Sequence, residues 1–475
     1  MQPGFEPHDS QAELLRLRDV YQRQRDAHAG DPFPDAAARR KRLGLLRHLL
    51  LQHGDEIATA ISADFGHRSS HETRSLEIFP SLAGVDHALA HLGRWMRAQR
   101  RGVSIWFKPA SNTVVPQPLG VVGVIVPWNY PLFLAVGPLT AALAAGNRAV
   151  VKISEYTPHF GETFRRLLAQ YFGEDEIAVI NGGVDVAQAF AGVAWDHLLF
   201  TGSTAVGKQV MRAAADNLTP VTLELGGKSP TLVGPDYAIA TAAERILHGK
   251  CLNAGQTCVA PDYVFLPRGS EQAFVDAARA AVQSWYPDLG RNPDYSAVIN
   301  SRHLQRLQGY LRDAEEKGAR IVPLAEADAA SGKLAPTLVL DVTEDMKLMQ
   351  DEIFGPILPV LAYDRLDQAI DYVNARPRPL ALYYFDYDRQ RIQQVLANTI
   401  SGGVGLNETV MHVGQDDLPF GGVGASGMGH YHGREGFETF SKMKPVFAQS
   451  RINGLWLMRP PYGKRMATLL KFMLR

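Results

Sequence analysis

Hydrophobic and polar residues follow two different periods along the chain. From Gln11 to about Arg100, leucine and alanine recur every three or four positions among charged residues, as in AARRKRLGLLRHLLLQHGDEIATAISADF. This period predicts helices. After Thr113 the hydrophobic residues gather in short β-branched runs that alternate with segments of helical period. Strand, helix and strand in this order predict parallel β–α–β units and a doubly wound α/β sheet.

The β-rich runs form two series. The first contains VVGVIVP, RAVVKIS, IAVIN, HLLFTG and VTLELGG. The second extends from Ser229 to about Asn407 and contains DYVFLPR, PTLVLDV and ILPVLAY. A glycine-rich stretch, LPFGGVGASGMG, and one more strand-like run, PVFAQS, follow. This organisation predicts two stacked α/β domains.

Two segments could be mistaken for membrane elements. The stretch between Lys108 and Arg148 has no charge, but prolines interrupt it, and it alternates between a strand pattern and a helix pattern. We therefore expect a buried β–α unit and no transmembrane segment. The C-terminal run KRMATLLKFMLR is too short to span a bilayer. It predicts a docked terminal helix, with a helix on a membrane surface or over a pocket as the alternatives.

Composition narrows the class of protein. The 475 residues exceed one domain of the usual size. Lys and Arg number 49 and Asp and Glu number 49, so the basic excess of a nucleic-acid-binding protein is missing. Two cysteines exclude a disulfide scaffold and fit a reducing compartment. Because the N-terminus has no secretory signal pattern, we expect a cytoplasmic protein.

Two glycine motifs suggest phosphate binding. The segment from Gly202 to Gln209, GSTAVGKQ, resembles a P-loop but has Gln where a magnesium-binding hydroxyl is needed. It follows a strand and opens a helix, so it either holds a pyrophosphate without metal or is an ordinary turn. The second motif, Gly422 to Gly427, lacks a clear preceding strand and is interpreted as a flexible structural loop.

Three residues could carry chemistry. Cys258 lies in the polar loop NAGQTCVAPDY, a setting that favours a nucleophilic thiol, although a structural cysteine is equally consistent. Glu224, at an apolar strand end, is either a general base or the partner of Lys228. Asn129, between two prolines, is either an oxyanion donor or a turn residue. Cys251 is interpreted as packing, and no metal site is expected. Together these features indicate covalent acyl chemistry with a nucleotide cofactor.

The chain resembles an aldehyde dehydrogenase over nearly its whole length. The runs that carry the resemblance are PWNYP, VVKISE, FTGSTAVGK, LELGGK, GQTC, EIFGP and PFGGVGASGMG. PFGGVGASGMGHYHG and RPPYG resemble the class 3 branch. DFGHRS, AADN, APDYV and DDLPFGGVG are similar to the bacterial coniferyl-aldehyde dehydrogenases.

The resemblance implies roles for single residues. Cys258 would attack the aldehyde, Asn129 would hold the oxyanion, and Glu224 would activate water to hydrolyse the thioester. The implied cofactor, NAD with NADP as the alternative, would contact Trp128, Lys152, Glu155, Gly202, Ser203, Gly207, Leu225, Glu352 and Phe354. The candidate substrate neighbours are Tyr130, Thr257 and Phe440. The two aromatic residues lie near these motifs and either line an apolar tunnel or belong to the core. Ile153 departs from the family, which commonly has proline there, whereas Glu155 favours NAD because a carboxylate repels a 2′-phosphate.

The implied fold has a Rossmann-type cofactor domain (1–99 and 119–227), an α/β catalytic domain (228–430), and a small β oligomerisation segment with the C-terminal tail (100–118 and 431–475). A homodimer would form by edge pairing of this segment. The expected substrate is a coniferyl-type aromatic aldehyde or a medium- or long-chain aliphatic one. Glu224 argues against a CoA-acylating relative, Gln209 against a P-loop hydrolase, and the three catalytic candidates together against a non-catalytic protein.

Overall fold

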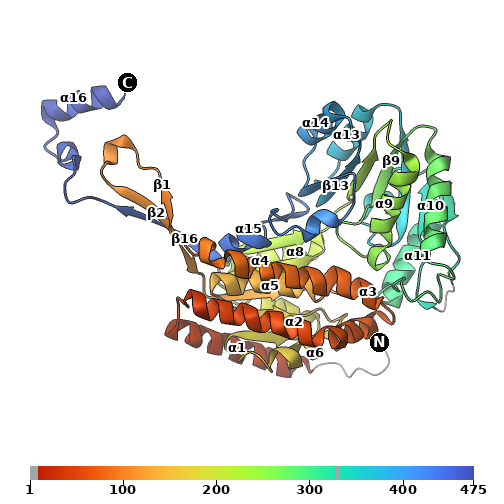
Figure 1. The fold of residues 1–475 in the computed structure, drawn as a ribbon, viewed down its shortest axis with the longest axis horizontal. Coiled ribbons are helices and arrows are strands. Elements are labelled where there is room, and N and C mark those ends of the chain that lie inside the picture. The colour runs from red at the N-terminus through yellow and green to blue at the C-terminus, as the bar shows by residue number, and fades with distance from the viewer. Residues whose placement is uncertain (1–8, 328–330, 475) are drawn as a thin grey trace.

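The protein has two α/β bodies and a projecting arm (Figure 1). The computed structural model describes residues 9–327 and 331–474; residues 1–8 of the predicted cofactor domain therefore lie outside the described residues. One body holds a six-stranded sheet, the other a seven-stranded sheet, and the arm a three-stranded sheet. The predicted α/β class with a small β segment is confirmed.

The first body is built on the six-stranded sheet, in the order β15-β7-β6-β3-β4-β5. All neighbours are parallel except β15, which is antiparallel to β7. Its strands are β3 (Val121–Ile125), β4 (Arg148–Lys152), β5 (Ile177–Ile180), β6 (His197–Gly202), β7 (Val221–Leu225) and β15 (Gly427–Met428).

Successive side chains of β3 face opposite sides of the sheet, and each side packs against its own layer of helices. Val121 and Ile125 share a core cluster with one set of helices: α1 (Ser10–Gly30), α7 (Val184–Ala191) and α8 (Thr204–Ala215). Val122 and Val124 share a core cluster with the other set: α2 (Ala36–Phe65), α4 (Phe79–Trp95), α5 (Phe133–Ala145) and α6 (Pro158–Leu168). Successive side chains of a strand point to opposite faces, so the sheet is covered on both sides.

From Val121 to Ala145 the uncharged segment is the buried β–α unit that was predicted, whereas residues 111–118 form a partly exposed strand. All five residues of β3 are buried, as are eleven of the 13 residues of α5. A helix buried all round has no solvent face, which explains why α5 carries no charge. Among the described residues, no helix combines the length and the apolar character that crossing a membrane requires.

The second body is built on the seven-stranded sheet, in the order β10-β11-β12-β9-β8-β13-β14. Val264 and Leu266 of β9 face α9 and α10, whereas Tyr263 and Phe265 face α13 and α14. The strands are β8 (Pro230–Val233), β9 (Tyr263–Pro267), β10 (Arg320–Pro323), β11 (Thr337–Leu340), β12 (Ile357–Tyr363), β13 (Ala381–Phe385) and β14 (Gly403–Leu406). The main helices are α9 (Ile239–Cys251), α10 (Glu271–Trp285), α11 (Ser301–Glu316), α13 (Leu366–Asn374) and α14 (Arg389–Asn398).

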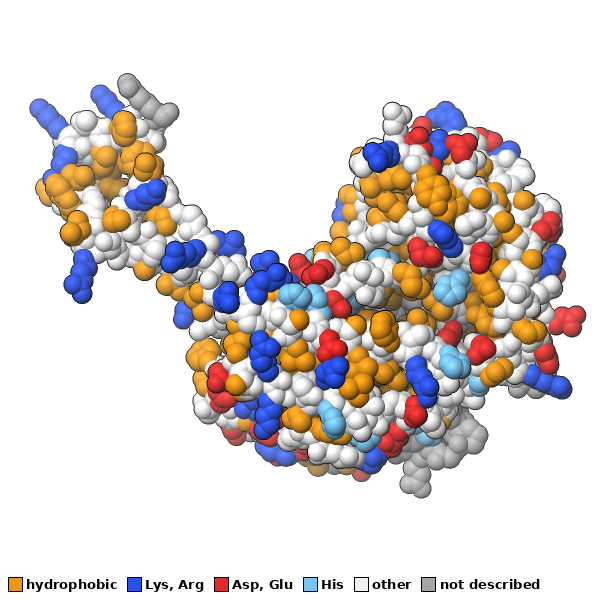
Figure 2. Space-filling view, viewed as in Figure 1, with side chains coloured by type: hydrophobic (Ala, Val, Ile, Leu, Met, Phe, Trp, Pro, Cys, Tyr) orange, Lys and Arg blue, Asp and Glu red, His pale blue; other side chains and the backbone are white. Residues whose placement is uncertain are grey.

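The arm joins segments that lie far apart in the sequence. β2 (Ser111–Pro118) pairs antiparallel with β1 (Gln99–Arg101) and with β16 (Ser441–Ala448). This is the predicted combination of residues near 100–118 with a strand from the C-terminal region. Residues 99–118 and 441–475 together contain eleven Lys and Arg and no Asp or Glu. Figure 2 shows these basic side chains beside hydrophobic ones on the arm.

The C-terminal run forms a helix, α16 (Gly463–Met473), but the expected docking is wrong. None of its residues is buried, and Phe472 is 70% exposed. The Phe472 ring contacts Trp106, on the arm itself, with 5.8 Å between centroids. The helix therefore extends the arm, far from the two α/β bodies (Figure 1).

The two glycine motifs differ in structure, and only the first has the structure that was predicted. Gly202 ends β6 and Ser203 is the N-cap of α8, which gives the expected strand–turn–helix. The second motif contains β15, where Gly427 pairs with Glu224 of β7. A Cβ at Gly427 would lie 2.1 Å from the Leu223 carbonyl oxygen, so the motif is packed tightly against the sheet. It is a structural element, although not the flexible loop that was expected.

Candidate active site

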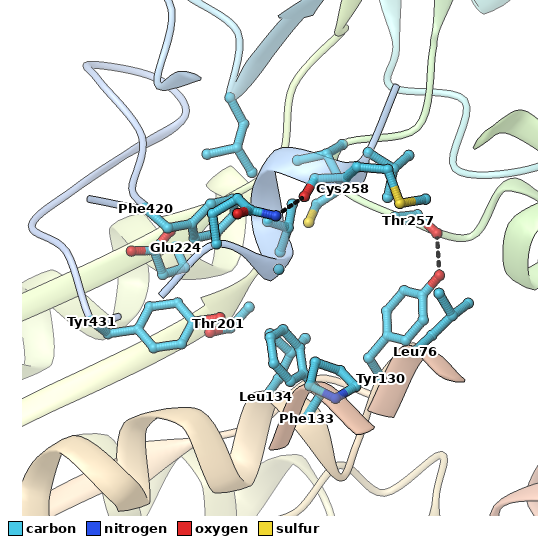
Figure 3. Close-up of a pocket in the computed structure, with 18 of the residues that line it drawn as sticks. Leu76, Tyr130, Phe133, Leu134, Thr201, Glu224, Thr257, Cys258, Phe420 and Tyr431 are labelled. Carbon is cyan, nitrogen blue, oxygen red and sulfur yellow. Dashed lines mark hydrogen bonds between the residues drawn. The ribbon is translucent and has the colours of Figure 1, made fainter. Parts of the chain in front are cut away.

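A cavity of about 390 Å³ lies between the two bodies, beside the carboxyl ends of β6 and β7 (Figure 3). Most of its lining is hydrophobic, including Phe79, Phe133, Leu134, Val413 and Phe420. The polar lining residues are Ser75, Tyr130, Thr201, Glu224, Thr257, Cys258, Gln415 and Tyr431. Cys258 and Glu224, which are 34 positions apart in sequence, therefore face one cavity.

Cys258 follows a strained turn at the end of α9. Asn253, Ala254 and Gly255 all have positive φ, at 50°, 51° and 73°. Two of these residues are not glycine, and such backbone strain is concentrated at functional loops. A Cβ at Gly255 would lie 2.3 Å from the Gly355 carbonyl oxygen. The cysteine loop is thus packed directly against the loop that carries Glu352.

Burial, with the nearby carboxyl groups of Glu352 and Glu224 adding to its effect, raises the pKa of the Cys258 thiol to about 12. The backbone N–H groups of Cys258 and Val259 act in the opposite direction, since they donate to the sulfur. The thiol is therefore neutral near pH 7, and a positive charge beside it would favour the thiolate. Cys251 is fully buried in the core, as predicted for a packing residue.

Glu224 is a buried carboxyl group at the end of β7. Its side chain is 2% exposed, and neither carboxylate oxygen has a hydrogen-bond partner among the described residues. Burial raises its pKa well above the usual value. Lys228, the alternative partner, instead binds Asp262 with an Nζ–Oδ2 distance of 2.6 Å. A desolvated, unpaired carboxyl facing a thiol has the properties of a general base.

Asn129 is held beside the cysteine loop. Its side-chain amide donates to the Gln256 carbonyl oxygen at 3.1 Å. Its own carbonyl accepts from Arg68 and from Asn253, both at 2.9 Å. Asn129 is 3% exposed and does not itself line the cavity. An amide nitrogen carries two N–H groups, so a second donor remains beyond the bond to Gln256.

The structure separates the three substrate candidates. Tyr130 and Thr257 line the cavity, and their hydroxyl groups lie 2.7 Å apart (Figure 3). Phe440 does not line it. Its fully buried ring packs against His197, with 5.3 Å between centroids. Phe440 therefore belongs to the core beneath the sheet, and its expected position near the substrate is not supported.

The cofactor candidates of the first body cluster at strand ends. Lys152 ends β4, Gly202 ends β6, and Leu225 ends β7. The carboxyl ends of parallel strands form the nucleotide-binding edge of doubly wound sheets. Ser203 caps the N-terminus of α8, which suits an anion. A Cβ at Gly207 would lie 2.6 Å from Leu225 Cδ2, so this glycine allows close packing of helix and strand.

The cofactor candidates Lys152 and Glu155 differ in burial. The Lys152 ammonium is buried and donates to the carbonyls of Ile153 at 2.6 Å and Gly182 at 2.7 Å. Burial lowers its pKa to about 8, while the carboxylate of Glu155 acts in the opposite direction. Glu155 itself is exposed.

The remaining cofactor candidates are Trp128, Glu352 and Phe354, which lie in loops. The rings of Trp128 and Phe354 meet edge to face, 5.3 Å apart. Glu352 is enclosed, and burial raises its pKa to about 8, with Asp262 adding to the effect. A Cβ at Gly226 would lie 2.1 Å from Glu352 Oε2, so a glycine is needed there. An unpartnered Glu352 oxygen and this glycine cradle fit a bound polar cofactor.

Comparison with known proteins identifies the family. The model of the aldehyde dehydrogenase family matches residues 24–446. The chain belongs to the aldehyde dehydrogenase family. A probable coniferyl aldehyde dehydrogenase of Pseudomonas aeruginosa is 57% identical over 461 residues, 97% of each chain. Aldehyde dehydrogenase family 3 member A2 of Mus musculus is 40% identical, over 97% of this chain and 93% of the mouse protein.

Solved structures agree with this assignment. The substrate-bound state of an aldehyde dehydrogenase from Staphylococcus aureus superposes with a TM-score of 0.92 at 36% identity, covering 96% of this chain and 99% of that one. Structures that hold NAD⁺ are similar at 25% to 28% identity. This aldehyde dehydrogenase therefore resembles the class 3 branch, as the motifs predicted, and NAD(P)-dependent aldehyde oxidation is its activity.

Sequence reasoning missed the buried charges beneath the active-site loops. Arg68, Glu72 and Glu77 come from the region that was interpreted only as helical. Glu72 accepts from the backbone N–H of Asn253 at 3.1 Å and from Ser296 at 2.6 Å. Charged residues of a helical pattern are normally solvated, so nothing in that pattern marks these three as buried.

Proposed function

We propose that this aldehyde dehydrogenase oxidises a hydrophobic aldehyde to its carboxylic acid through a covalent bond to Cys258. The Cys258 thiol loses its proton to water, and the thiolate attacks the aldehyde carbon to form a thiohemiacetal. The Asn129 amide and the Cys258 backbone N–H hold its oxyanion. NAD or NADP, when bound, would supply the oxidant that takes the hydride from the thiohemiacetal carbon and leaves a thioester. Glu224 then takes a proton from water, whose oxygen attacks the thioester carbon, and the carbon–sulfur bond breaks to release the acid and the Cys258 thiolate. The observation that carries this proposal is that Cys258 and Glu224 line one apolar cavity.

The cofactor of this reaction is NAD, with NADP as the alternative. Lys152 and Glu155 would bind the adenosine ribose, and Ser203 the pyrophosphate. Glu352 would bind the nicotinamide ribose, and the ring would lie near Phe354. The exposed Glu155 carboxylate supports NAD, because it would repel the 2′-phosphate of NADP.

The substrate is a coniferyl-type aromatic aldehyde or a medium- or long-chain aliphatic aldehyde. The largely hydrophobic lining supports both classes, since each aldehyde would bury apolar surface there. The name of the Pseudomonas aeruginosa relative supports the aromatic class. Within the lining, Gln415 offers an amide to the phenol hydroxyl of such a substrate.

The test is NADH or NADPH formation with coniferyl aldehyde, benzaldehyde, octanal and propanal, each with NAD and NADP. Wild type is compared with Cys258→Ala. We expect turnover by the wild type and none by the variant, and the ratios of kcat/KM identify substrate class and cofactor. Equal turnover by Cys258→Ala would overturn the assigned nucleophile. No turnover by wild type with any pair would overturn the proposed substrate class.

The same proposal includes a homodimer in the cytoplasm. Its proposed domains are a cofactor domain (1–99 and 119–227), a catalytic domain (228–430), and an oligomerisation segment with the C-terminal tail (100–118 and 431–475). Charge supports association through the arm. The arm carries eleven positive charges, and the chain as a whole is neutral, so the two bodies carry a compensating negative charge. Light scattering tests the dimer, and a variant that lacks residues 441–475 is expected to be monomeric.

A further inference from the structure

A second, smaller cavity lies behind the active-site cavity. Its volume is about 30 Å³. Pro80, Phe133 and Tyr431 line both cavities and form the wall between them. The small cavity lies among α4, α5 and the start of α15 (Gly433–Thr439), within the first body.

The small cavity is lined by buried polar groups that find no partner. Tyr431 OH and both ring nitrogens of His432 make no hydrogen bond within the described part of the chain. The same holds for Ser81 Oγ, Trp95 Nε1 and Thr140 Oγ1. These five side chains are between 1% and 6% exposed. Buried polar groups are almost always hydrogen-bonded to protein or to ordered water, so five such groups around one space point to a ligand that can both donate and accept.

Water is the ligand that fits this space. A cavity of about 30 Å³ has room for about one or two water molecules, and a buried water usually makes about three hydrogen bonds. Hydroxyl groups both donate and accept, the indole donates, and a neutral imidazole does one of each. Burial lowers the pKa of His432 to about 3, so its ring is neutral and keeps an acceptor nitrogen. The lining can therefore satisfy water fully.

Tyr431 connects this space to the general base. Its side chain extends toward Thr201 at the end of the active-site cavity where Glu224 lies (Figure 3). Thr201 Oγ1 and both Glu224 oxygens are also without partners among the residues described. Burial raises the pKa of the Tyr431 hydroxyl, and the nearby charge of Glu224 adds to the effect, so the hydroxyl stays protonated and able to donate.

Asp416 lies at the outer side of the small cavity. It lines the cavity and is half-buried, so its carboxyl group also reaches the surface. Burial raises its pKa above the usual value, and His87 acts in the opposite direction. A carboxyl group in this position can accept a proton from cavity water and release it to solvent.

We propose that the small cavity is a water site and that Tyr431 relays to it the proton that Glu224 takes from the hydrolytic water, with Asp416 as the exit to solvent. This inference rests on the proposed hydrolysis by Glu224. In that step the water oxygen bonds to the acyl carbon and the carbon–sulfur bond breaks. The proton taken up by Glu224 passes through a water molecule of the active-site cavity to the Tyr431 oxygen, while the Tyr431 proton passes to water in the small cavity. No proton is left in the site at the end of the cycle.

The first test is Tyr431→Phe, which removes the hydroxyl and keeps the ring in the wall. We expect the first-turnover formation of NADH to keep its rate while kcat falls about tenfold, less than the 10²- to 10⁴-fold loss of a general base. A burst of NADH should appear or grow, and the solvent deuterium isotope effect on kcat should rise. Thr140→Val, which lines the small cavity but not the active-site cavity, should give the same signature more weakly.

The matched control is Tyr295→Phe. The Tyr295 hydroxyl donates to the Leu334 carbonyl at 2.8 Å and is also buried, so this variant loses a hydrogen bond outside the active site. Its kcat and isotope effect should equal those of wild type. If Tyr431→Phe lowered the first-turnover rate as much as kcat, Tyr431 would only shape the substrate site. If Thr140→Val behaved like wild type, the proton would not cross the small cavity. Either result overturns the relay.

A crystal structure of the wild-type protein tests the water site independently of activity. We expect ordered water bonded to Ser81, Thr140 and His432. A dry cavity overturns the inference even if the enzyme is active. Water there in a protein that oxidises no tested aldehyde would instead point to failure of the proposed function.

Discussion

Arg68 and Glu77 form an ion pair with 2.8 Å between Nη1 and Oε1, and both side chains are 0% exposed. The same Arg68 nitrogen donates to the Asn129 carbonyl, and Glu77 accepts from the backbone N–H of Leu132 at 2.8 Å. The pair is thus hydrogen-bonded to the backbone of the loop that carries Asn129. A buried ion pair is weak evidence for stability, but removing one partner leaves an uncompensated charge. Its function here is to fix the position of a proposed oxyanion donor.

Arg68→Met is therefore expected to cost about 3–5 kcal/mol of unfolding free energy and to lower kcat. Thermal unfolding and steady-state turnover measure the two effects. Arg268→Met is the control, because its pair with Asp364 is more than half exposed on both sides and such pairs contribute about 0–1 kcal/mol. Equal effects of the two substitutions would contradict the assigned function of the buried pair.

Glu224→Gln is expected to separate the two halves of the reaction. The amide keeps the shape of the carboxyl group but cannot take a proton from water. The first turnover should still yield NADH, whereas steady turnover should fall roughly 10²- to 10⁴-fold. Rapid mixing with limiting and excess aldehyde measures both phases. Loss of both phases in a folded protein would mean that Glu224 acts before hydride transfer.

The sequence predicted the parts of this molecule that follow a period or a motif. β3 and α5 were predicted because burial on all sides leaves a charge-free segment, and the strand before GSTAVGK was predicted from its β-branched run. Cys258, Glu224 and Asn129 were chosen because each residue type is unusual in its local setting. Long-range packing left no such signal. Phe440 was assigned to the substrate from its position near a motif, yet its ring packs against His197 in the core.

The C-terminal helix illustrates the same limit. Its amphipathic pattern predicted a helix correctly, and burial of the apolar face was the expected consequence. In the structure that face lies on an arm whose paired strands β2 and β16 are about 330 positions apart in the sequence, and it stays exposed. Arg68 and Glu77 present the opposite case, since charged residues of a helical pattern became the most buried ion pair of the active-site loops. Neither outcome follows from the local period.

The pH dependence of Cys258 alkylation tests its environment. Because the pKa of the thiol is raised to about 12, the thiolate fraction should grow about tenfold per pH unit between roughly pH 7 and 10, without a plateau. Iodoacetamide labelling followed by mass spectrometry measures the rate. Cys258→Ala should show no labelling, because Cys251 is fully buried. A rate that levels off above about pH 9.5 would show that the free protein holds an ordinary thiol, whose pKa is about 8.5.

Gly226→Ala tests whether the position of the Glu352 carboxyl group matters for cofactor binding. The added Cβ would lie 2.1 Å from Glu352 Oε2, and the carboxyl group must move away because no real contact is that short. Gly226 does not have a positive φ, so alanine costs no backbone strain there and the effect is confined to Glu352. A displacement of about 1 Å at such a group can cost on the order of 10²-fold in rate. We expect the KM for the cofactor to rise at least tenfold while the melting temperature changes little. Gly309→Ala, in α11 with open space around it, is the control and should leave KM unchanged. If Gly226→Ala also left KM unchanged, Glu352 would not contact the cofactor, and its raised pKa would reflect burial alone.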